Sequence, residues 1–434
     1  MLASGSSLKS LSPATSWVVG ALASSFLFST PAQGRDLWES DDGDRYITLN
    51  SSVKSVMLLS EESLPDTGSQ GINFWRGRLD LQMVPAPWLE TELAYEHRIV
   101  LDAGGGGLTA SSPFLPPVGE LPYRLIPLGS QLIDENGVLY EQSFDRMAMA
   151  LRGQWGEIKV GRQAIGMGRA SFFSVLDVLS PFGTFQVDQE WKAGVDALDG
   201  TLLVSDTSSV GLSVASEHAW EDAAVLGRYQ AYFKDVDVIV MGGKRSEDYM
   251  MGVAASTQII DAEFHGEFAG FKTDGTGFES AQWGDEGIFK FVGGGSYSFG
   301  VLGGLNLLSE YHFNGFGIAN IGEKPGTLLD SDWSRRLQRG DFQTIGRHEI
   351  AASFNLVVDE NMTTLAYAVL SPVDGSGLAA LGASWSYSDH LSLDANAFLP
   401  WGGGLSANSW GLLLPESEYG ASPATLYFSL RFYD

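Results

Sequence analysis

The chain has 434 residues, with glycine very frequent at 53 and charged residues limited to 18%. The 53 Asp and Glu residues outnumber the 26 Lys and Arg, and the resulting net charge of −27 argues against nucleic-acid binding through a basic face. The sequence contains no cysteine, which is compatible with an oxidising compartment in which no disulfide is needed.

Residues 1–34 have the pattern of a secretory signal peptide. Lys9 is the only charge before the apolar run WVVGALASSFLF at 17–28, and the small residues Ala32 and Gly34 follow at positions that a signal peptidase prefers. A short buried helix is the alternative. No later segment has the about 18 uninterrupted apolar residues of a membrane helix. An exported chain of this kind is either soluble outside the cytoplasm or a transmembrane barrel.

From Arg35 onward the dominant pattern is alternation of apolar and polar residues, which is typical of strands that separate two environments. The runs 73–84, 89–98 and 144–155 are the clearest, and a PAP turn at 85–87 makes the first two a hairpin. The apolar face of these runs carries Trp75, Leu79, Leu81, Met83, Leu89, Leu93, Tyr95, Met147, Met149, Leu151 and Trp155. The polar face carries Arg76, Arg78, Asp80, Gln82, Glu90, Glu92, Glu96, Arg98, Arg146 and Arg152, and it needs water or partner charges.

The joints between the runs alternate between short and mostly longer connections. Short joints are expected near 85–87, 156, 205–209, 235–237, 260–261, 299–301, 358–361 and 388–390. Longer ones are expected at 59–71, 101–138, 167–189, 217–223, 244–248, 272–285, 314–343, 372–377 and 401–422. A sandwich has no reason to sort its loops in this way, whereas a membrane barrel with short periplasmic turns and long extracellular loops does.

The sequence therefore predicts an all-β fold, a transmembrane antiparallel β-barrel in which residues 35–434 form a single domain. About eighteen strands are expected, or sixteen if the weakest runs, near 226–233 and 236–241, are not strands. A barrel of this size encloses a water-filled lumen. Nine tryptophans near strand ends suit a lipid–water interface, or else simply cap strands: Trp38, Trp88, Trp155, Trp191, Trp220, Trp283, Trp385, Trp401 and Trp410.

The C-terminal run ATLYFSLRFYD alternates Leu426, Phe428, Leu430 and Phe432 with polar residues. It resembles the last strand of bacterial outer-membrane proteins, in which a lipid-facing aromatic residue is recognised by the barrel-assembly machinery. Asp434 follows the aromatic pair here, which departs from that habit. The resemblance implies the barrel-assembly machinery as a partner.

A second resemblance lies in GEIKVGRQAIGMGRASFFSVLDVLSPF at 156–182 and DQEWKAGVDALDG at 188–200. These residues resemble a region of Gram-negative outer-membrane porin-like barrels, including the alginate-export type, with Gly194 and Asp196 as the G-x-D element. The resemblance implies that the loop at 167–189 folds into the pore and narrows it. Its apolar residues would be costly in open water, so packing against the lumen wall is expected. A loop over the rim or a short buried helix is the alternative.

Arg162 conflicts with the alternation, because Ile158 and Val160 face lipid and the same parity would send Arg162 to lipid as well. A bulge at Gly161 would turn Arg162 inward, since one extra residue reverses every later side chain. We therefore expect such an irregularity, or an Arg162 that reaches water at the rim. Inside the barrel, Arg162 could pair with Asp177, Asp188 or Asp196.

The sequence predicts no catalytic or metal chemistry. Its six histidines are scattered, without the spacing of a zinc site or of a nucleophile and its base. The acidic segments 41–44 and 330–334 do not match an EF-type calcium loop and are expected to be solvated outer segments. No enzyme activity and no cofactor are therefore expected.

The sequence predicts an outer-membrane porin for passive, constricted diffusion of small hydrophilic solutes. Outer-membrane lipid and lipopolysaccharide are the expected surroundings, and a homo-oligomer is an open alternative. The expected pore-lining and constriction residues are Arg76, Arg78, Asp80, Glu92, Glu96, Arg146, Arg152, Arg162, Arg169, Asp177, Asp188 and Asp196. Their charges would either face one another across the pore and orient a solute or form a ladder of salt bridges. A sheath or exit duct for an export or electron-transfer complex is the alternative function.

Overall fold

The computed structural model describes residues 35–61, 70–102, 114–115, 121–135, 137–183, 186–273, 287–301, 303–323, 325–407 and 411–434. The expected signal peptide, Trp283 and Trp410 lie outside these residues. Within them, twenty strands form one antiparallel sheet, and eighteen of these close into a barrel. The other two, β1 (Arg35–Glu39) and β5 (Gly129–Glu135), pair with β2 and β6 beside the ring.

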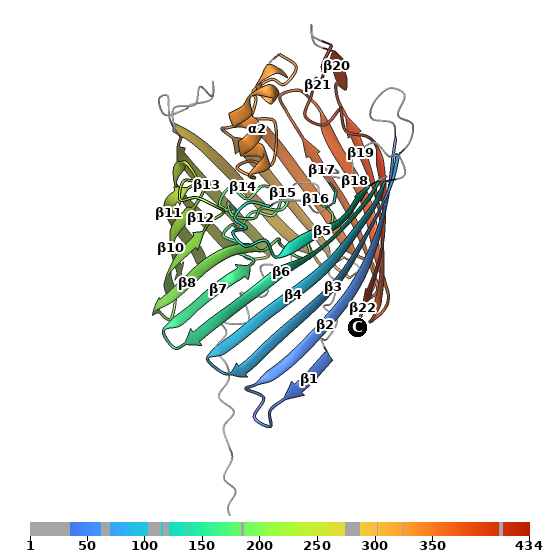
Figure 1. The fold of residues 1–434 in the computed structure, drawn as a ribbon. Helices are drawn as coiled ribbons and strands as arrows, with labels where there is room; N and C mark the ends of the chain where they lie inside the picture. Colours follow the sequence, from blue (N-terminus) through green and yellow to red (C-terminus); the bar gives the residue numbers. More distant parts are fainter. Residues whose placement is uncertain are drawn as a thin grey trace, which may run out of the picture.

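The strands of the ring follow one another around the barrel in chain order (Figure 1). They are β2 (Tyr46–Ser60), β3 (Gln70–Ala86), β4 (Leu89–Asp102), β6 (Val138–Gly153), β7 (Gly156–Gln163), β8 (Val195–Ser205), β9 (Ser208–Ala215), β10 (Ala224–Phe233), β11 (Val236–Arg245), β12 (Asp248–Ile259), β13 (Ala262–Lys272), β14 (Gly287–Phe299), β15 (Leu305–Asn314), β16 (His348–Val357), β17 (Met362–Leu370), β18 (Gly377–Ser388), β19 (Leu391–Trp401) and β22 (Thr425–Tyr433). Among the described residues, the prediction of about eighteen strands is confirmed, and the two weakest runs are β10 and β11.

The C-terminal strand β22 closes the ring by pairing with β19 on one edge and with β2 on the other. Its residues Leu426, Phe428, Leu430 and Phe432 are exposed on the outside, whereas Tyr427, Ser429 and Arg431 are buried on the inside. This alternation is what a wall between lipid and a polar interior requires. It follows directly from the period of two in the sequence.

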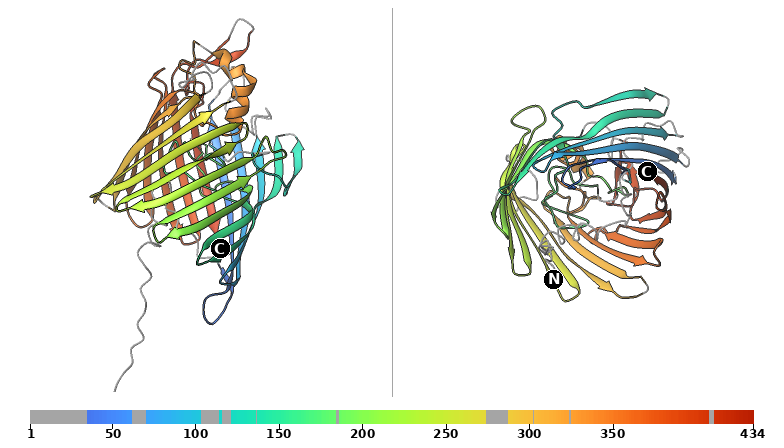
Figure 2. Two further views of the ribbon diagram at one scale, coloured as in Figure 1. Left: turned by 90° about the vertical axis from the view of Figure 1, so that its left-hand side faces the viewer. Right: turned by 90° about the horizontal axis from the view of Figure 1, so that it is seen from below.

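Short turns gather at one end of the barrel and longer connections at the other, as predicted (Figures 1 and 2). One connection differs, since β11 and β12 are joined by only Ser246 and Glu247 where a longer joint was expected. A second difference concerns the acidic segment 41–44, which lies in the β1–β2 turn at the short-turn end and not in an outer loop.

The long connection between β15 and β16 forms a cap at the outer mouth. It contains the 3-10 helix η2 (Pro325–Leu329) and helix α2 (Ser331–Gln338), whose N-cap Asp330 accepts bonds from the amides of Asp332 and Trp333. Buried Arg336 on α2 contacts Asp248 of β12 at 3.0 Å and Asp341 at 3.2 Å. These ion pairs seat the helix on the short turn between β11 and β12. The hairpin of β20 (Leu405–Ala407) and β21 (Leu413–Pro415) lies at the same end (Figure 1).

Most of the described tryptophans from the predicted set lie exposed near strand ends: Trp38, Trp88, Trp155, Trp220, Trp385 and Trp401. Trp191 is different, because it lies inside the barrel against Arg76 and Arg78 of β3. Its interfacial role was therefore predicted wrongly. The reason is that the segment before β8 enters the lumen, so a residue close to a strand in sequence is far from lipid.

Among the described residues, no helix is both long enough and apolar enough to cross a membrane.

Candidate functional site

The chain leaves the wall after β7, and the described residues 164–183 and 186–194 lie inside the barrel before the chain returns as β8 (Figure 2). We call these residues the inner segment. The apolar side chains of its run 172–179 are buried: Phe172, Phe173, Val175, Leu176, Val178 and Leu179. Phe173 stacks on His312 of β15 with ring centroids 5.0 Å apart, and Phe172 lies 6.1 Å from Tyr367 of β17. The apolar run is thus removed from water by packing against the inner face of the wall.

Two buried glutamates of the wall hold the backbone of the inner segment. Glu267 of β13 accepts bonds from the amides of Arg169, Ala170, Val175 and Leu176, with distances of 2.7 Å and 3.0 Å for the last two. Glu310 of β15 accepts the amides of Ser171, Phe172 and Phe173 at 2.6, 2.9 and 3.2 Å. Residues 169–176 have no strand partner, so their buried amides would otherwise lack hydrogen-bond acceptors. The two carboxylates supply those acceptors.

The C-terminal part of the inner segment is held to the wall by ion pairs and by cation–π contacts. Asp188 lies 3.0 Å from Lys54 of β2 and 2.7 Å from Arg76 of β3. Burial alone would raise the pKa of Asp188, but these two cations outweigh it and hold the pKa well below its usual range. Trp191 lies over Arg76 and Arg78, with ring centroids 4.5 Å and 4.8 Å from the two guanidinium carbons.

Three expected pore residues belong to this same unit. Arg169 forms an ion pair of 2.5 Å with Asp237 of β11, and Asp177 is bonded to Lys192 within the segment. Asp177 and Asp188 are therefore structural anchors and do not project freely into a pore. Burial raises the pKa of Asp177, and the charge of Lys192 opposes that rise.

The charged residues of β3, β4 and β6 form a ladder on one side of the barrel. Arg78 lies 2.8 Å from Asp80 and 3.1 Å from Asp145, and it also contacts Glu96. Arg146 contacts Asp145 at 2.5 Å and Glu92 at 3.6 Å. Because these strands are neighbours, the second of the two alternatives, a ladder of cross-strand salt bridges, describes these residues.

Arg152 lies apart from the deep part of this ladder. It bonds to Glu90 and Glu157 at the rim, and half of its side chain is exposed. Glu157 directly precedes Ile158 of β7, which faces lipid. The ion pair of Arg152 and Glu157 therefore marks the end of the apolar band on the outside of the barrel. Among the expected pore residues, Arg152 is the one that water reaches most easily.

Arg162 takes neither of the two places that the sequence offered. The registers of β7 with β6 and with β8 run without a shift, so the bulge predicted at Gly161 is not there. Gly161 instead has a φ of +116°, and a Cβ would collide with the carbonyl of Met147. Near the end of β7, the guanidinium of Arg162 reaches Asp196 of β8 at 2.7 Å and the Phe144 carbonyl of β6 at 3.1 Å.

The pair of Arg162 and Asp196 closes a seam in the wall. Asp196 also accepts the amide of Ile126 at 2.8 Å, and its own amide bonds to the carbonyl of Tyr123. Residues 121–128 thus cover the gap that β7 leaves when the chain turns inward. Both charged side chains are buried there, so their assignment as pore-lining residues is corrected to wall residues. Of the three acids considered for Arg162, Asp196 is its partner.

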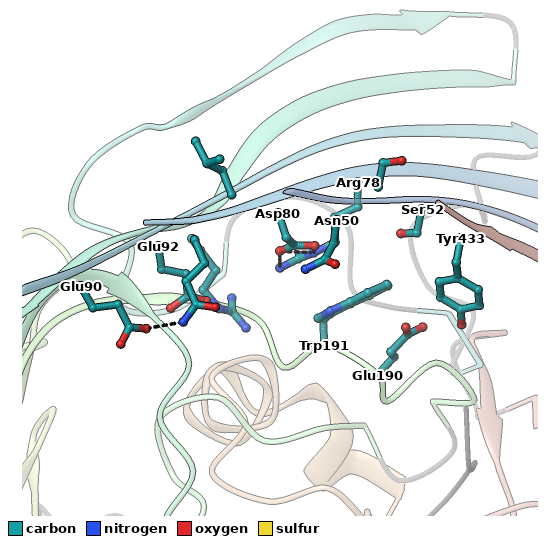
Figure 3. A pocket seen from close by; sticks show the side chains of 13 residues that line it. Asn50, Ser52, Arg78, Asp80, Glu90, Glu92, Glu190, Trp191 and Tyr433 are labelled. Atoms are coloured by element: carbon teal, nitrogen blue, oxygen red, sulfur yellow. Dashed lines mark hydrogen bonds and ion pairs between the residues drawn. The ribbon is translucent and has the colours of Figure 1, made fainter. Parts of the chain in front are cut away.

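A cavity of about 560 Å³ lies between the ladder and the inner segment (Figure 3). The wall contributes residues from β2, β3, β4 and β6, and the inner segment contributes Glu190 and Trp191 from the other side. The full lining is Asn50, Ser51, Ser52, Arg78, Asp80, Leu81, Gln82, Glu90, Glu92, Arg146, Glu190, Trp191 and Tyr433. It brings together five of the expected pore residues, namely Arg78, Asp80, Glu92 and Arg146 in its lining and Glu96 behind them.

Sequence reasoning missed several residues that build this interior: Lys54, Asp145, Glu190, Glu267, Glu310 and Arg431. The period of two was the signal for Glu267 and Glu310, which alternate with outward residues and share their inner faces with other polar residues on β13 and β15. Arg431 was visible in the same way on β22, where it lies 2.7 Å from Asp394. Nothing in the sequence indicated which of these charges would meet the inner segment.

Three of the six histidines each contact a different polar side chain. His265 contacts Glu310 at 2.9 Å, His348 contacts the Tyr311 hydroxyl at 2.8 Å and His97 contacts that of Tyr140 at 2.9 Å. Among the residues that the structure describes, no three His, Asp or Glu side chains gather in a group that could hold a metal ion.

The fold is shared with solved structures at low sequence identity. OccAB4 of Acinetobacter baumannii is 8% identical with a TM-score of 0.53, and the match covers 93% of this chain and 100% of that one. A BenF-like porin from Pseudomonas fluorescens is 11% identical with a TM-score of 0.51, covering 89% and 98%. The outer membrane protein OpdK from Pseudomonas aeruginosa is 9% identical with a TM-score of 0.50, again covering 89% and 98%.

The chain has the fold of an outer-membrane porin. No protein-family model matches it, and no curated protein matches it either. The porin part of the resemblance in the sequence is confirmed at the level of the fold. The alginate-export subtype stays a prediction.

Proposed function

We propose that this protein is an outer-membrane porin that gives small hydrophilic solutes a passive, constricted path. The observation that carries the proposal is a cavity that stays open between the inner segment and strands β2, β3, β4 and β6, inside a closed barrel whose other strands hold the inner segment in place. A filled core would need apolar contacts all round, whereas ten of the thirteen residues that line this cavity are Asn, Ser, Gln or charged, and only Leu81, Trp191 and Tyr433 are apolar or aromatic. Such a surface favours hydrated solutes.

The outer face supports a place in the outer membrane. Large apolar side chains are exposed on strands all round the ring, for example Val160, Val253, Leu381 and Phe428. Their exposure to water would be unfavourable, and lipid removes that cost. The solved structures with the same fold include one titled a porin and one titled an outer membrane protein.

The inner segment disfavours the alternative function of a sheath for a partner. A threaded partner would need the space that the inner segment occupies, and residues 169–176 of that segment are tied to β13 and β15 by seven backbone amides. The separated histidines and the salt-bridged acids likewise favour a channel over an enzyme. The single-channel current of the purified protein is the direct measurement.

In a planar bilayer we expect steady ion steps from the wild type and larger steps from the Glu267→Ala variant. Loss of Glu267 leaves four amides of the inner segment without their acceptor, which loosens the constriction. Glu263→Ala is the matched control, because Glu263 lies on the same inner face of β13. A wild-type barrel that gives no ion steps would contradict the porin function. Ion steps of equal size in the Glu267→Ala and Glu263→Ala variants would contradict the constriction.

A further inference from the structure

The cavity beside the inner segment has the size of a binding site for a small molecule. Its volume of about 560 Å³ lies within the usual range for ligand sites. Two of its sides come from different parts of the chain, since Asp80 and Glu92 project from the wall and Glu190 and Trp191 from the inner segment (Figure 3). A solute in the cavity would therefore touch acidic groups from both sides.

The carboxylates of the cavity are more accessible than the arginines that line it. The side chains of Asp80, Glu92 and Glu190 are 27%, 31% and 19% exposed. Those of Arg78 and Arg146 are only 2% and 6% exposed. The cations therefore lie behind the carboxylates, and the surface that a solute meets is acidic.

The arginines are also already engaged. Arg78 contacts three carboxylates, those of Asp80, Glu96 and Asp145. Arg146 contacts two carboxylates and the Lys192 carbonyl. Asp80 and Glu92 also have cationic partners, Arg78 at 2.8 Å and Lys159 at 2.6 Å. An anionic solute would have to displace carboxylates from the buried arginines, whereas a cationic solute would meet carboxylates that are partly exposed.

Glu190 has the weakest compensation of the three acids. Its nearest cation, Arg431, lies 3.5 Å away and is bonded more closely to Asp394 at 2.7 Å. Burial raises the pKa of Glu190, and the charge of Asp188 raises it further. A cation placed beside Glu190 would relieve this unfavourable charge. The indole of Trp191 and the ring of Tyr433 in the same lining provide aromatic surface for the apolar part of such a solute.

We propose that this cavity binds small organic cations with an ammonium or guanidinium group, which is held between Glu190 of the inner segment and Asp80 and Glu92 of the wall. The inference deepens the proposed porin function, because it names the solute class of the same pathway. Binding and passage are separate properties, so the test measures each of them.

Binding is measured by titration calorimetry on the purified full chain in detergent, with agmatine, glutarate and arabinose as cationic, anionic and neutral probes. We expect agmatine to bind and glutarate and arabinose not to bind. The triple variant D80N/E92Q/E190Q should weaken agmatine binding about fivefold or more, since it removes three partly exposed partners of the cation. The control D206N/D235N/D261N removes the same number of charges from exposed residues of three short turns, which lie together at the short-turn end of the barrel. This control should bind agmatine like the wild type.

Passage is measured by the swelling of liposomes in the same three probes. Preferred entry of agmatine over glutarate in the wild type, reduced in the triple variant and kept in the control, is the expected result. Binding of glutarate in place of agmatine, or equal agmatine binding by the two triple variants, would overturn the cation site. Entry of none of the probes would overturn the porin function, and calorimetry would still decide the site. A triple variant that does not fold leaves the comparison of agmatine with glutarate in the wild type as the deciding measurement.

Discussion

The arginines of this barrel show that the same side chain has different consequences at different depths. Arg162 is buried and bidentate to Asp196, with distances of 2.7 Å and 2.9 Å. Arg152 is half exposed at the rim and bonds to Glu90 and Glu157. Removal of one partner of a buried ion pair leaves the other charge buried without compensation, whereas water solvates the charge that remains from an exposed pair. The two residues should therefore differ in stability effect.

We expect Arg162→Ala to lower the free energy of unfolding by about 3 kcal/mol, because Asp196 is left buried without its cation. Urea unfolding in phospholipid vesicles, followed by tryptophan fluorescence, measures this change. Arg152→Ala is the matched control, and its effect should stay under about 1 kcal/mol. Similar losses in the two variants would contradict the assignment of Arg162 to a closed seam.

At the scale of elements, carboxylates tie the outer loops together at the mouth. Glu418, in the connection from β19 to β22, accepts the amides of Ile345 at 2.7 Å and Gly346 from the connection before β16. Its own amide donates to Asp374 in the β17–β18 joint at 2.9 Å. The neighbouring Tyr419 hydroxyl donates to Glu349 of β16 at 2.7 Å. Several acids thus meet with few cations between them.

This arrangement predicts that the mouth is more stable at low pH. Burial raises the pKa of Glu418 from 4.5 to about 7, opposed by the two amides and assisted by Asp374. A carboxyl with a raised pKa in the folded state stabilises that state while it is protonated. The contribution is complete below about pH 4.5 and is lost as the pH rises to about 7, by up to about 3 kcal/mol.

The measurement is the urea midpoint between pH 4.5 and pH 8 for the wild type and the Glu418→Gln variant. The variant keeps the shape and one acceptor oxygen but cannot ionise. Its midpoint should therefore fall less with rising pH than that of the wild type, and the difference isolates Glu418 from other acids. Parallel curves would show that Glu418 does not cause the dependence.

At the scale of the whole molecule, the wall separates an apolar exterior from a charged interior, and the position of a residue across it decides what is tolerated. Val253 lies in the middle of β12 and faces outward, whereas Val301 is exposed in the joint between β14 and β15. Both are valines on the outside of the protein. Only the first lies at the depth where the surroundings contain no water.

Val253→Arg should therefore cost about 2 to 4 kcal/mol of unfolding free energy, and Val301→Arg about 0 to 1 kcal/mol. Unfolding in lipid vesicles gives both values. In detergent micelles, where water reaches the surface more easily, the gap should narrow. An equal cost for the two substitutions in lipid would contradict the proposed position of the membrane around the barrel.

The period of two in the sequence determined most of the wall. Residues of β3, β4, β6 and β22 face the sides that alternation predicts, because successive side chains of any strand point to opposite faces. Loop lengths determined which end carries the long connections. These are local properties, and each can be read from a few adjacent residues. At the exception, the short turn 246–247, Arg336 of α2 from a distant loop contacts Glu247 and Asp248.

The interior was decided by tertiary structure. The apolar residues of the inner segment could be predicted to seek cover, but not that Glu267 and Glu310 would hold their amides. The charged residues of β3, β4 and β6 could be recognised in the sequence. Only the pairing of these strands as neighbours in the barrel shows that the charges form a ladder and do not face one another across the pore. Arg162 and Asp196, 34 residues apart, meet because β7 and β8 pair. Charge interactions depend on distance and burial, which alternation along one strand does not contain, so the sequence determined the wall and only the closed barrel determined the site within it.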